Sequence, residues 1–542
     1  TPVFEKSFSG AVQQTFGSYG LSSSLIKVRA GSKKWAYLAS SQFRMGDGFR
    51  PNSDFQSNQS YVRFDWKAFK NGLFSFELTR SMALAKQAGG LDEAQYLLNS
   101  MTSSRSRNYF SSHWLMPVIK FNYKANAILN YQIQLFAMSS GRTQLGFIKT
   151  NEVLDVPNSE GIYPNRLMDR DKYTSYGLET RLGINSNKIQ GIVGLRLFSG
   201  NMFRQQQGQA NNKVSYDEQL IDSNFPRSLN FVNDNASLFL ENAWEIIPKV
   251  KLTSGLRYEY ILYKGDGFIA TNSPFLSPNR QRNFILWGTG ISYKPYTQLE
   301  FFTNLSQSFR PISFSDLLPA ATTDIIDSQL KDAQALNFDL GVRGKYSNFL
   351  KYDLSFYNLQ FFDRIGSISK KNTDGLPYLY RTNLGQSVSK GLELYIEIDP
   401  ITLFWDRSRF GYLSFFASLG LNQSVYENFV LTTGVNLAGK QVENAPQQIL
   451  RSGLTYTFKR SSFTYQINHT SDSFSDAQNT IKPNASATIG LIPSYIIHDF
   501  SFTYKYRKHW LLKGSVNNIG NVSYFTRRGT GAYPGYGILP SA

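Results

Sequence analysis

Leu336-Asn-Phe-Asp-Leu-Gly-Val-Arg343 alternates apolar and polar residues over its whole length. Successive side chains on a β-strand point to opposite faces, so this stretch would have one apolar and one polar face. The same alternation recurs along the chain, for example over residues 391–398 and 499–506. A water-soluble sheet would bury the apolar face, but here the opposite face also carries many charges. The pattern therefore predicts an all-β fold, a transmembrane antiparallel β-barrel whose apolar side chains meet lipid.

The composition agrees with one large all-β unit, a transmembrane β-barrel domain over residues 1–542. No apolar run approaches the ~20 residues that a membrane-spanning helix needs, whereas a barrel strand needs only about 10 alternating residues. Aromatic residues make up 15% of the chain, with Phe and Tyr far ahead of Trp. Cys is absent, which excludes disulfides and thiolate metal sites. Because the chain has no such apolar run, a helical membrane protein is excluded.

The net charge of +18 leaves three interpretations open: a solvated basic loop surface, anionic ligands in the lumen, or anionic lipid head groups at the rim. The basic residues are spread along the chain rather than gathered in one stripe or arm. This distribution argues against nucleic acid as a partner.

Alternation and turn residues together predict about 21 strands. Tight turns, such as Lys70-Asn-Gly72 and Ile247-Pro-Lys249, alternate with long connections. Trp244 would end one strand at a tight turn, and Tyr258 and Tyr260 would end the next at a long loop. Short periplasmic turns, long extracellular loops and aromatic girdles are typical of outer-membrane barrels. The long loops are predicted at residues 86–111, 149–172, 200–233, 264–281, 311–334, 366–383 and 472–492.

The strand count is odd, although a barrel with both ends in the periplasm has an even number. The last readable strand runs from Trp510 to about Tyr524, and residues 527–540 then form a loop. We therefore expect 22 strands in the full protein, with 21 readable here and the closing strand absent from this sequence.

Several hairpins resemble those of TonB-dependent outer-membrane receptors. They lie at residues 17–20, 46–50, 236–258, 383–393 and 517–525. Further segments are similar to the ferric citrate-type branch of that family: residues 89–95, 104–108, 476–480 with 492–495, and 532–535.

The resemblance implies a bacterial outer-membrane protein that imports an iron chelate, ferric citrate or a similar siderophore, with energy from the TonB complex. The family carries an N-terminal plug and a TonB-contacting segment, but here Thr1 leads within a few residues into the first strand, Phe8 to Phe16. We expect the plug to be absent from this sequence, through truncation or because another chain fills the lumen. Two alternatives remain: a partner-filled scaffold of an envelope complex, or a peptide or glycan importer working with a surface lipoprotein.

Arginine is the expected ligand-binding residue, because its planar fork matches a carboxylate with two hydrogen bonds. Arg310 and Arg204 are the leading candidates, since each would end a strand with its side chain facing an arriving ligand. Solvated charges, or pairing with residues such as Asp169 and Asp316, are the competing interpretation. The remaining candidates lie in the predicted loops: Arg105, Arg107, Arg381 and Arg527.

Haem cargo and enzymatic activity are disfavoured by the residues present. Only four His occur, and none follows Phe309-Arg-Pro311, where haem receptors of the family would carry one. The sequence shows no His pair at metal spacing and no nucleophile elbow. We therefore expect a protein that is not an enzyme, with no cofactor and no resident metal.

Overall fold

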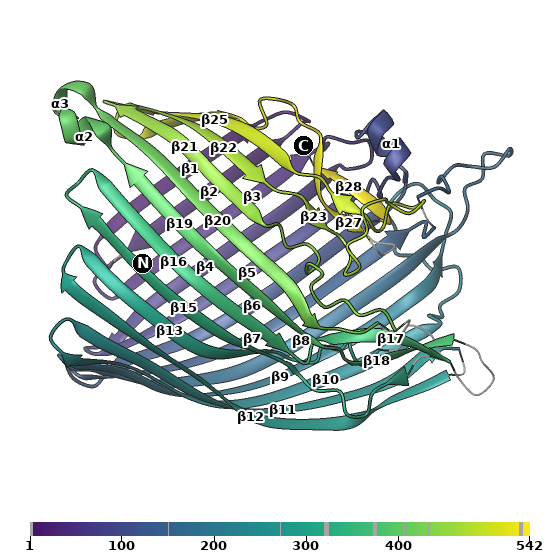
Figure 1. The fold of residues 1–542 in the computed structure, drawn as a ribbon, viewed down its shortest axis with the longest axis horizontal. Coiled ribbons are helices and arrows are strands. Elements are labelled where there is room, and N and C mark those ends of the chain that lie inside the picture. Colours follow the sequence, from purple (N-terminus) through teal and green to yellow (C-terminus); the bar gives the residue numbers. More distant parts are fainter. Residues whose placement is uncertain are drawn as a thin grey trace.

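The computed structural model describes residues 4–149, 151–271, 273–318, 325–371, 377–405, 407–431, 434–529 and 535–541. Within these ranges, 21 strands form one antiparallel sheet that curves into a barrel (Figure 1). The predicted fold class and strand number are confirmed. In chain order the strands are β1 (Ser7–Phe16), β2 (Ser22–Gly31), β3 (Trp35–Gly46), β4 (Phe55–Phe69), β5 (Gly72–Lys86), β6 (Tyr109–Lys124), β7 (Leu129–Gly146), β8 (Arg166–Asn185), β9 (Ile189–Ala210), β10 (Arg227–Ile247), β11 (Val250–Ala270), β12 (Ser273–Tyr296), β13 (Leu299–Arg310), β15 (Ala333–Tyr346), β16 (Leu350–Phe362), β19 (Gln386–Ile398), β20 (Tyr412–Asn428), β21 (Gln448–Phe458), β22 (Ser461–Thr470), β25 (Tyr495–Tyr506) and β26 (Trp510–Val516).

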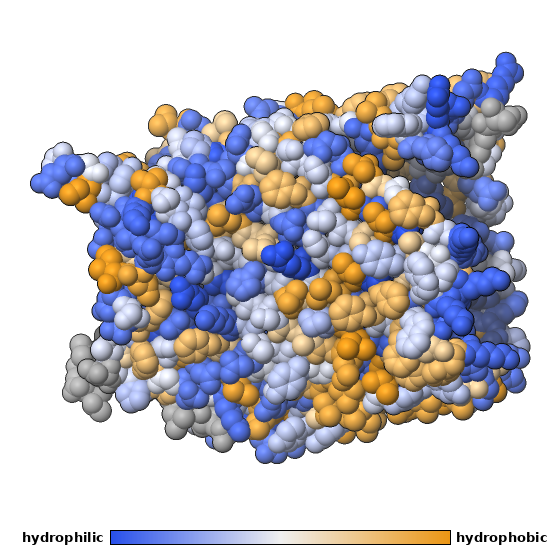
Figure 2. Space-filling view, turned by 180° about the vertical axis from the view of Figure 1, so that it is seen from behind, coloured by the Kyte–Doolittle hydropathy of each residue, from blue (hydrophilic) through white to orange (hydrophobic). Residues whose placement is uncertain are grey.

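The apolar residues of the alternating pattern lie on the outer wall. Leu340, Phe356, Leu392 and Leu421 form one row across four neighbouring strands, in direct register. Their side chains are 36% to 52% exposed, which no stacked-sheet core would allow. Figure 2 shows apolar side chains spread over the outer wall among hydrophilic ones. This arrangement fits a wall that meets lipid.

The two ends of the barrel differ, as the sequence predicts. Tight turns join the strands at one end of the barrel (Figure 1). One connection at this end is longer and contains two short helices, α2 (Pro400–Phe404) and α3 (Arg407–Phe410). The other end carries the long loops and helix α1 (Glu93–Leu98). Small sheets lie within the long connections: β14 (Ile325–Ile326) with β17 (Ile365–Lys371) and β18 (Pro377–Asn383), and β23 (Ser473–Phe474) with β24 (Leu491–Ile492).

Several long loops are shorter than predicted, because the strands continue past the lipid-facing band. β11 runs on to Ala270, so Tyr258 and Tyr260 lie in the middle of this strand and not at its end. Beyond them the ladder between β10 and β11 continues, for example at Asn230 opposite Asp266. Backbone pairing needs no apolar face, so these polar extensions resemble loops in sequence. Trp244, by contrast, lies close to the end of β10, as predicted.

The end of the chain also differs from the prediction. β26 ends at Val516, and Tyr524 begins a separate strand, β27 (Tyr524–Gly529), which pairs with β28 (Gly537–Ser541). The segment expected to be a plain loop is therefore part of a hairpin. Among the described residues β1 and β26 are the two edges of the large sheet and do not pair with each other. A closing strand and a plug in the full protein remain predictions. No helix in the described ranges is long and apolar enough to span a bilayer.

Candidate functional site

A cluster of two arginines and one aspartate lies on the inner wall towards the loop end. Asp171 on β8 stands in register between Arg142 on β7 and Arg204 on β9. Its carboxylate lies 2.6 Å from Arg142 Nη2 and 2.8 Å from Arg204 Nε. Successive side chains of a strand point to opposite faces. Tyr176 is 62% exposed on the outer wall, and Asp171 lies an odd number of positions from it, so the side chain of Asp171 faces the lumen.

This first cluster carries a surplus positive charge, since two guanidinium groups share one carboxylate. The hydroxyl of Tyr173 donates a third contact to Asp171 at 3.1 Å. Asp171 is almost fully buried, whereas the Arg142 side chain remains 41% exposed. The carboxylate therefore fixes the orientation of both arginines, and part of the Arg142 side chain remains exposed on the lumen side.

A second cluster of the same composition joins two of the predicted arginines. Asp316, in the segment after β13, lies 3.0 Å from Arg310 Nη2 and 3.4 Å from Arg381 Nη1. Arg381, on β18, also donates to the carbonyl of Ser315 at 2.7 Å. The Arg310 side chain is 51% exposed and that of Asp316 only 6%. Arg310 and Arg381, both predicted site residues, are thus brought together on one carboxylate.

Asp316 is ionised, because its environment favours the charged form. Burial raises the pKa of this carboxyl, but hydrogen bonds from the Ser313 hydroxyl and amide, and then from Arg310, outweigh it. The net result is a pKa below the ordinary value for Asp. The second cluster therefore keeps its Arg–Asp–Arg charge pattern at neutral pH.

An apolar cluster connects the two charged ones. The Phe314 ring stacks on Phe231 with centroids 4.7 Å apart, and it lies 5.5 Å from the ring of Tyr263. Met202, Leu229 and Phe231 are buried there, and Tyr173 and Phe314 pack against them. Since Tyr173 contacts Asp171, and Phe314 is two positions from Asp316, the segment after β13 brings the two clusters to the same part of the inner wall.

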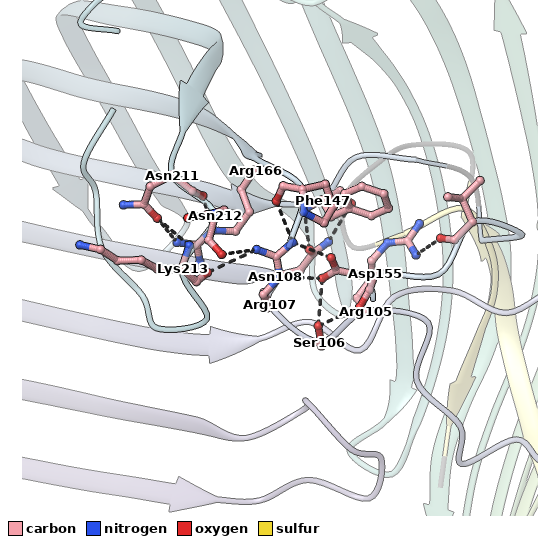
Figure 3. A network of polar contacts seen from close by, with 12 residues as sticks. Arg105, Ser106, Arg107, Asn108, Phe147, Asp155, Arg166, Asn211, Asn212 and Lys213 are labelled. Carbon is pink, nitrogen blue, oxygen red and sulfur yellow. Dashed lines mark hydrogen bonds and ion pairs between the residues drawn. The ribbon is translucent and has the colours of Figure 1, made fainter. Parts of the chain in front are cut away.

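Arg105 and Arg107 occupy a different environment, inside the layer of long loops (Figure 3). Arg107 is fully buried, lies 2.6 Å from Asp155, and donates to the carbonyls of Asn212 and Pro164 at 2.9 and 3.0 Å. Arg105 is 5% exposed and donates to carbonyls of Ser104, Lys149 and Val153. In this conformation both side chains fasten loops together and offer no surface to a ligand.

Arg527 lies exposed on β27 and is not brought to either charged cluster. Its neighbour Arg528 is buried and holds the β27–β28 hairpin to other loops, through Glu93 at 2.9 Å and the carbonyl of Leu491 at 2.8 Å. Arg142 and Asp171 were not among the predicted site residues, because the candidates were arginines of loops and strand ends. The alternation of side chains along β7 could have identified Arg142. Leu135 faces outward, and Arg142 lies an odd number of positions from it, so it faces the lumen.

Below the first cluster, the inner wall has a cavity of about 620 Å³ that extends from β7 to β13. Three of its lining residues, Gly183, Gly255 and Gly288, project no side chain into the lumen. Glycine in a strand often marks close approach of another chain or a ligand. No group of three or more His, Asp or Glu in the described ranges is placed to hold a metal ion.

A barrel with 21 strands in its described part, an apolar outer wall and basic clusters on the lumen side defines an outer-membrane transport protein. Residues 34–519 match the family described as TonB dependent receptor-like, beta-barrel, and the chain belongs to this family. It is accordingly an outer-membrane protein and a transporter rather than an enzyme, and membership of this family implies an interaction with TonB.

Solved structures of such receptors have the same fold. The ferric citrate transporter FecA in its unliganded form aligns with a TM-score of 0.80 and 17% identity, over 100% of this chain and 78% of that one. The siderophore receptor PiuA from Acinetobacter baumannii aligns with a TM-score of 0.77 and 13% identity, over 99% and 80%. The copper transporter OprC gives 0.76 and 13%, over 100% and 80%. No curated protein matches this chain.

Proposed function

We propose that this barrel imports an anionic iron chelate, ferric citrate or a similar siderophore, into the periplasm with energy from TonB. The observation that carries the proposal is the pair of Arg–Asp–Arg clusters on the inner wall. Each has one more positive than negative charge, and each keeps an arginine 41% or 51% exposed. Charge-assisted hydrogen bonds from guanidinium groups are well suited to a carboxylate-rich chelate.

The wall below the clusters supports passage of an anion. Arg196 faces the lumen on β9, with its guanidinium 5.5 Å from the Phe136 ring centroid. Further down, the glycine-lined cavity leaves space along the wall. A chelate released from the upper clusters would thus meet another cation and then a stretch of wall where Gly183, Gly255 and Gly288 leave space. Two of the similar structures, named as a ferric citrate transporter and a siderophore receptor, support the class of cargo.

The experiment measures uptake of radioactive iron supplied as ferric citrate to cells that lack the gene. Restoring the wild-type gene should restore uptake, and the double variant Arg204→Ala, Arg310→Ala should not. Arg343→Ala is the matched control, because Arg343 is 52% exposed and pairs with Glu300 at 3.1 Å, much as Arg310 pairs with Asp316. Unchanged ferric citrate uptake after deletion of the gene would refute this cargo.

A further inference from the structure

A second cavity, of about 430 Å³, lies on the inner wall directly above the first charged cluster. Its polar lining is mostly amide, with Ile148, Leu167 and Pro226 as apolar neighbours. The Arg142–Asp171 pair of the β7–β8 ladder is followed two positions on by the pair Gln144–Asp169, which opens this cavity. We call it the amide pocket, and its polar lining residues are Gln144, Asp169, Gln206, Gln207 and Gln209.

The backbone is distorted at the amide pocket. The β8–β9 ladder changes register between Met168 and Arg170, which leaves one extra residue on β9. Gln207 there has a φ of 64°, a left-handed conformation that costs free energy for any residue except glycine. Bulges are common next to functional sites, where they re-aim a side chain. The distortion brings the side-chain amide of Gln206 and the backbone amide of Gln207 to one carboxylate.

Asp169 holds this distorted segment. Its carboxylate accepts the Gln207 backbone amide at 2.8 Å and the Gln206 side-chain amide at 3.1 Å. An ionised carboxylate only accepts hydrogen bonds, so the Gln206 NH₂ group must face Asp169. The other end of that amide, the Gln206 side-chain oxygen, is buried without a hydrogen-bond partner in the described part of the chain. A buried acceptor in that state is stabilised by an incoming donor.

The chemistry of the amide pocket differs from that of the cluster below it. Glutamine side chains donate and accept hydrogen bonds without net charge, and the charge of Asp169 is offset by its electrostatic interactions with Arg204 and Arg227. Hydroxyl and amide groups supply the missing donor for Gln206. The volume lies within the range of small-molecule sites. The amide pocket therefore suits a neutral polar group, and the arginines next to it suit an anionic one.

We propose that the amide pocket binds a neutral, amide- or hydroxyl-bearing arm of the cargo whose carboxylate contacts Arg142 and Arg204. This inference rests on the proposed function and narrows the cargo to carboxylate chelates that carry such arms, in preference to citrate itself. Arg142 and Arg204 define the anionic end of the ligand, and Gln144 and Gln206 define its neutral end.

The test compares two probes on the full-length protein by isothermal titration calorimetry: ferric citrate and the ferric complex of a citrate bearing two amide-linked hydroxamate arms. The wild type should bind the amide-armed chelate more tightly. In the double variant Gln144→Leu, Gln206→Leu, affinity for that chelate should fall about tenfold, as expected for the loss of two neutral hydrogen bonds. Affinity for ferric citrate should stay the same, which also shows that the variant is folded.

Gln466→Leu provides the control, because Gln466 lies on β22, lines a different cavity and bonds to Asn468 at 2.9 Å. It should change neither affinity. Equal loss of both chelates in the double variant, or no loss of the amide-armed one, would overturn the amide pocket while leaving the proposed function in place. If the wild type binds neither chelate, both the proposed function and this inference are refuted.

Discussion

One nitrogen of Arg310, Nη2, lies 3.0 and 3.2 Å from the two carboxylate oxygens of Asp316. The aspartate is buried and held by Ser313, whereas half of the arginine side chain is exposed. Arg310 is therefore oriented before any ligand arrives, and little side-chain entropy remains to be lost on binding. Arg204 is also oriented by a buried aspartate, but it donates from two nitrogens to the two oxygens of Asp171 and is only 15% exposed.

Replacing Arg310 should weaken binding of an anionic chelate. In Arg310→Ala, the affinity of full-length protein for ferric citrate should fall by about 1.5–3 kcal/mol, the range for a hydrogen bond to a charged group. Calorimetric titration measures this loss. Arg343→Ala removes an equally exposed, singly paired arginine near the tight turns and should leave the affinity unchanged. Equal effects of the two substitutions would remove Arg310 from the site.

Asp316 should make the segment 311–318 sensitive to acid. The folded-state pKa of Asp316 lies below its ordinary value of 3.8. Its ionised form therefore stabilises the segment fully above pH 3.8, and this contribution is lost as the pH falls through the lower, folded value. Hydrogen exchange at the Ser313 amide, which donates to Asp316 at 2.9 Å, should accelerate in that range. Asp316→Asn should abolish this dependence, and a variant with the wild-type profile would contradict the assignment.

Arg107 should stabilise the loop layer and leave the barrel unaffected. Arg107→Met leaves Asp155 buried without its ion-pair partner, and breaking a buried pair in this way costs about 3–5 kcal/mol. We expect faster proteolysis between residues 149 and 166 with unchanged unfolding of the barrel. Adding Asp155→Leu removes the unpaired charge and should restore much of the resistance. Persistent sensitivity in the double variant would show that the ion pair is not the cause.

The outward direction of the apolar face can be measured with single cysteines, because the natural chain has none. A nitroxide at Leu340→Cys should be relaxed by oxygen, which partitions into lipid, and the same label at Asp339→Cys by a water-soluble nickel chelate. Leu340 is 52% exposed on the outer wall, and Asp339 occupies the opposite face of β15. The reverse pattern would contradict the register of the barrel.

The sequence was sufficient to predict the barrel because the decisive signal is local. Alternation along Leu336–Arg343 depends only on neighbouring positions, and lipid outside the barrel keeps the pattern regular. The ends of the strands were harder to predict from the sequence. The pairing of Asn230 with Asp266 continues β10 and β11 where both faces are polar, and no alternation marks it.

The candidate site was predictable only in part, because contacts between loops are not local. Arg310 and Arg204 were both predicted to end strands; Arg310 does end β13, but Arg204 lies within β9, which continues to Ala210. Their partners and the burial of Arg107 depend on how separate loops meet, for example residue 155 beside residue 107. Nothing in the sequence around Arg105 and Arg107 distinguishes loop-fastening arginines from arginines that face a ligand.

The location of bound iron is the sharpest test of the proposed site. Crystals or particles of the full-length protein with ferric citrate should show iron, identified by its anomalous scattering or density, between the Arg142–Asp171–Arg204 cluster and the Arg310–Asp316–Arg381 cluster. Carboxylate oxygens of the chelate should lie within hydrogen-bond distance of Arg204 or Arg310. Iron bound elsewhere on the barrel, or a saturated complex in which neither arginine contacts the chelate, would contradict the proposed site.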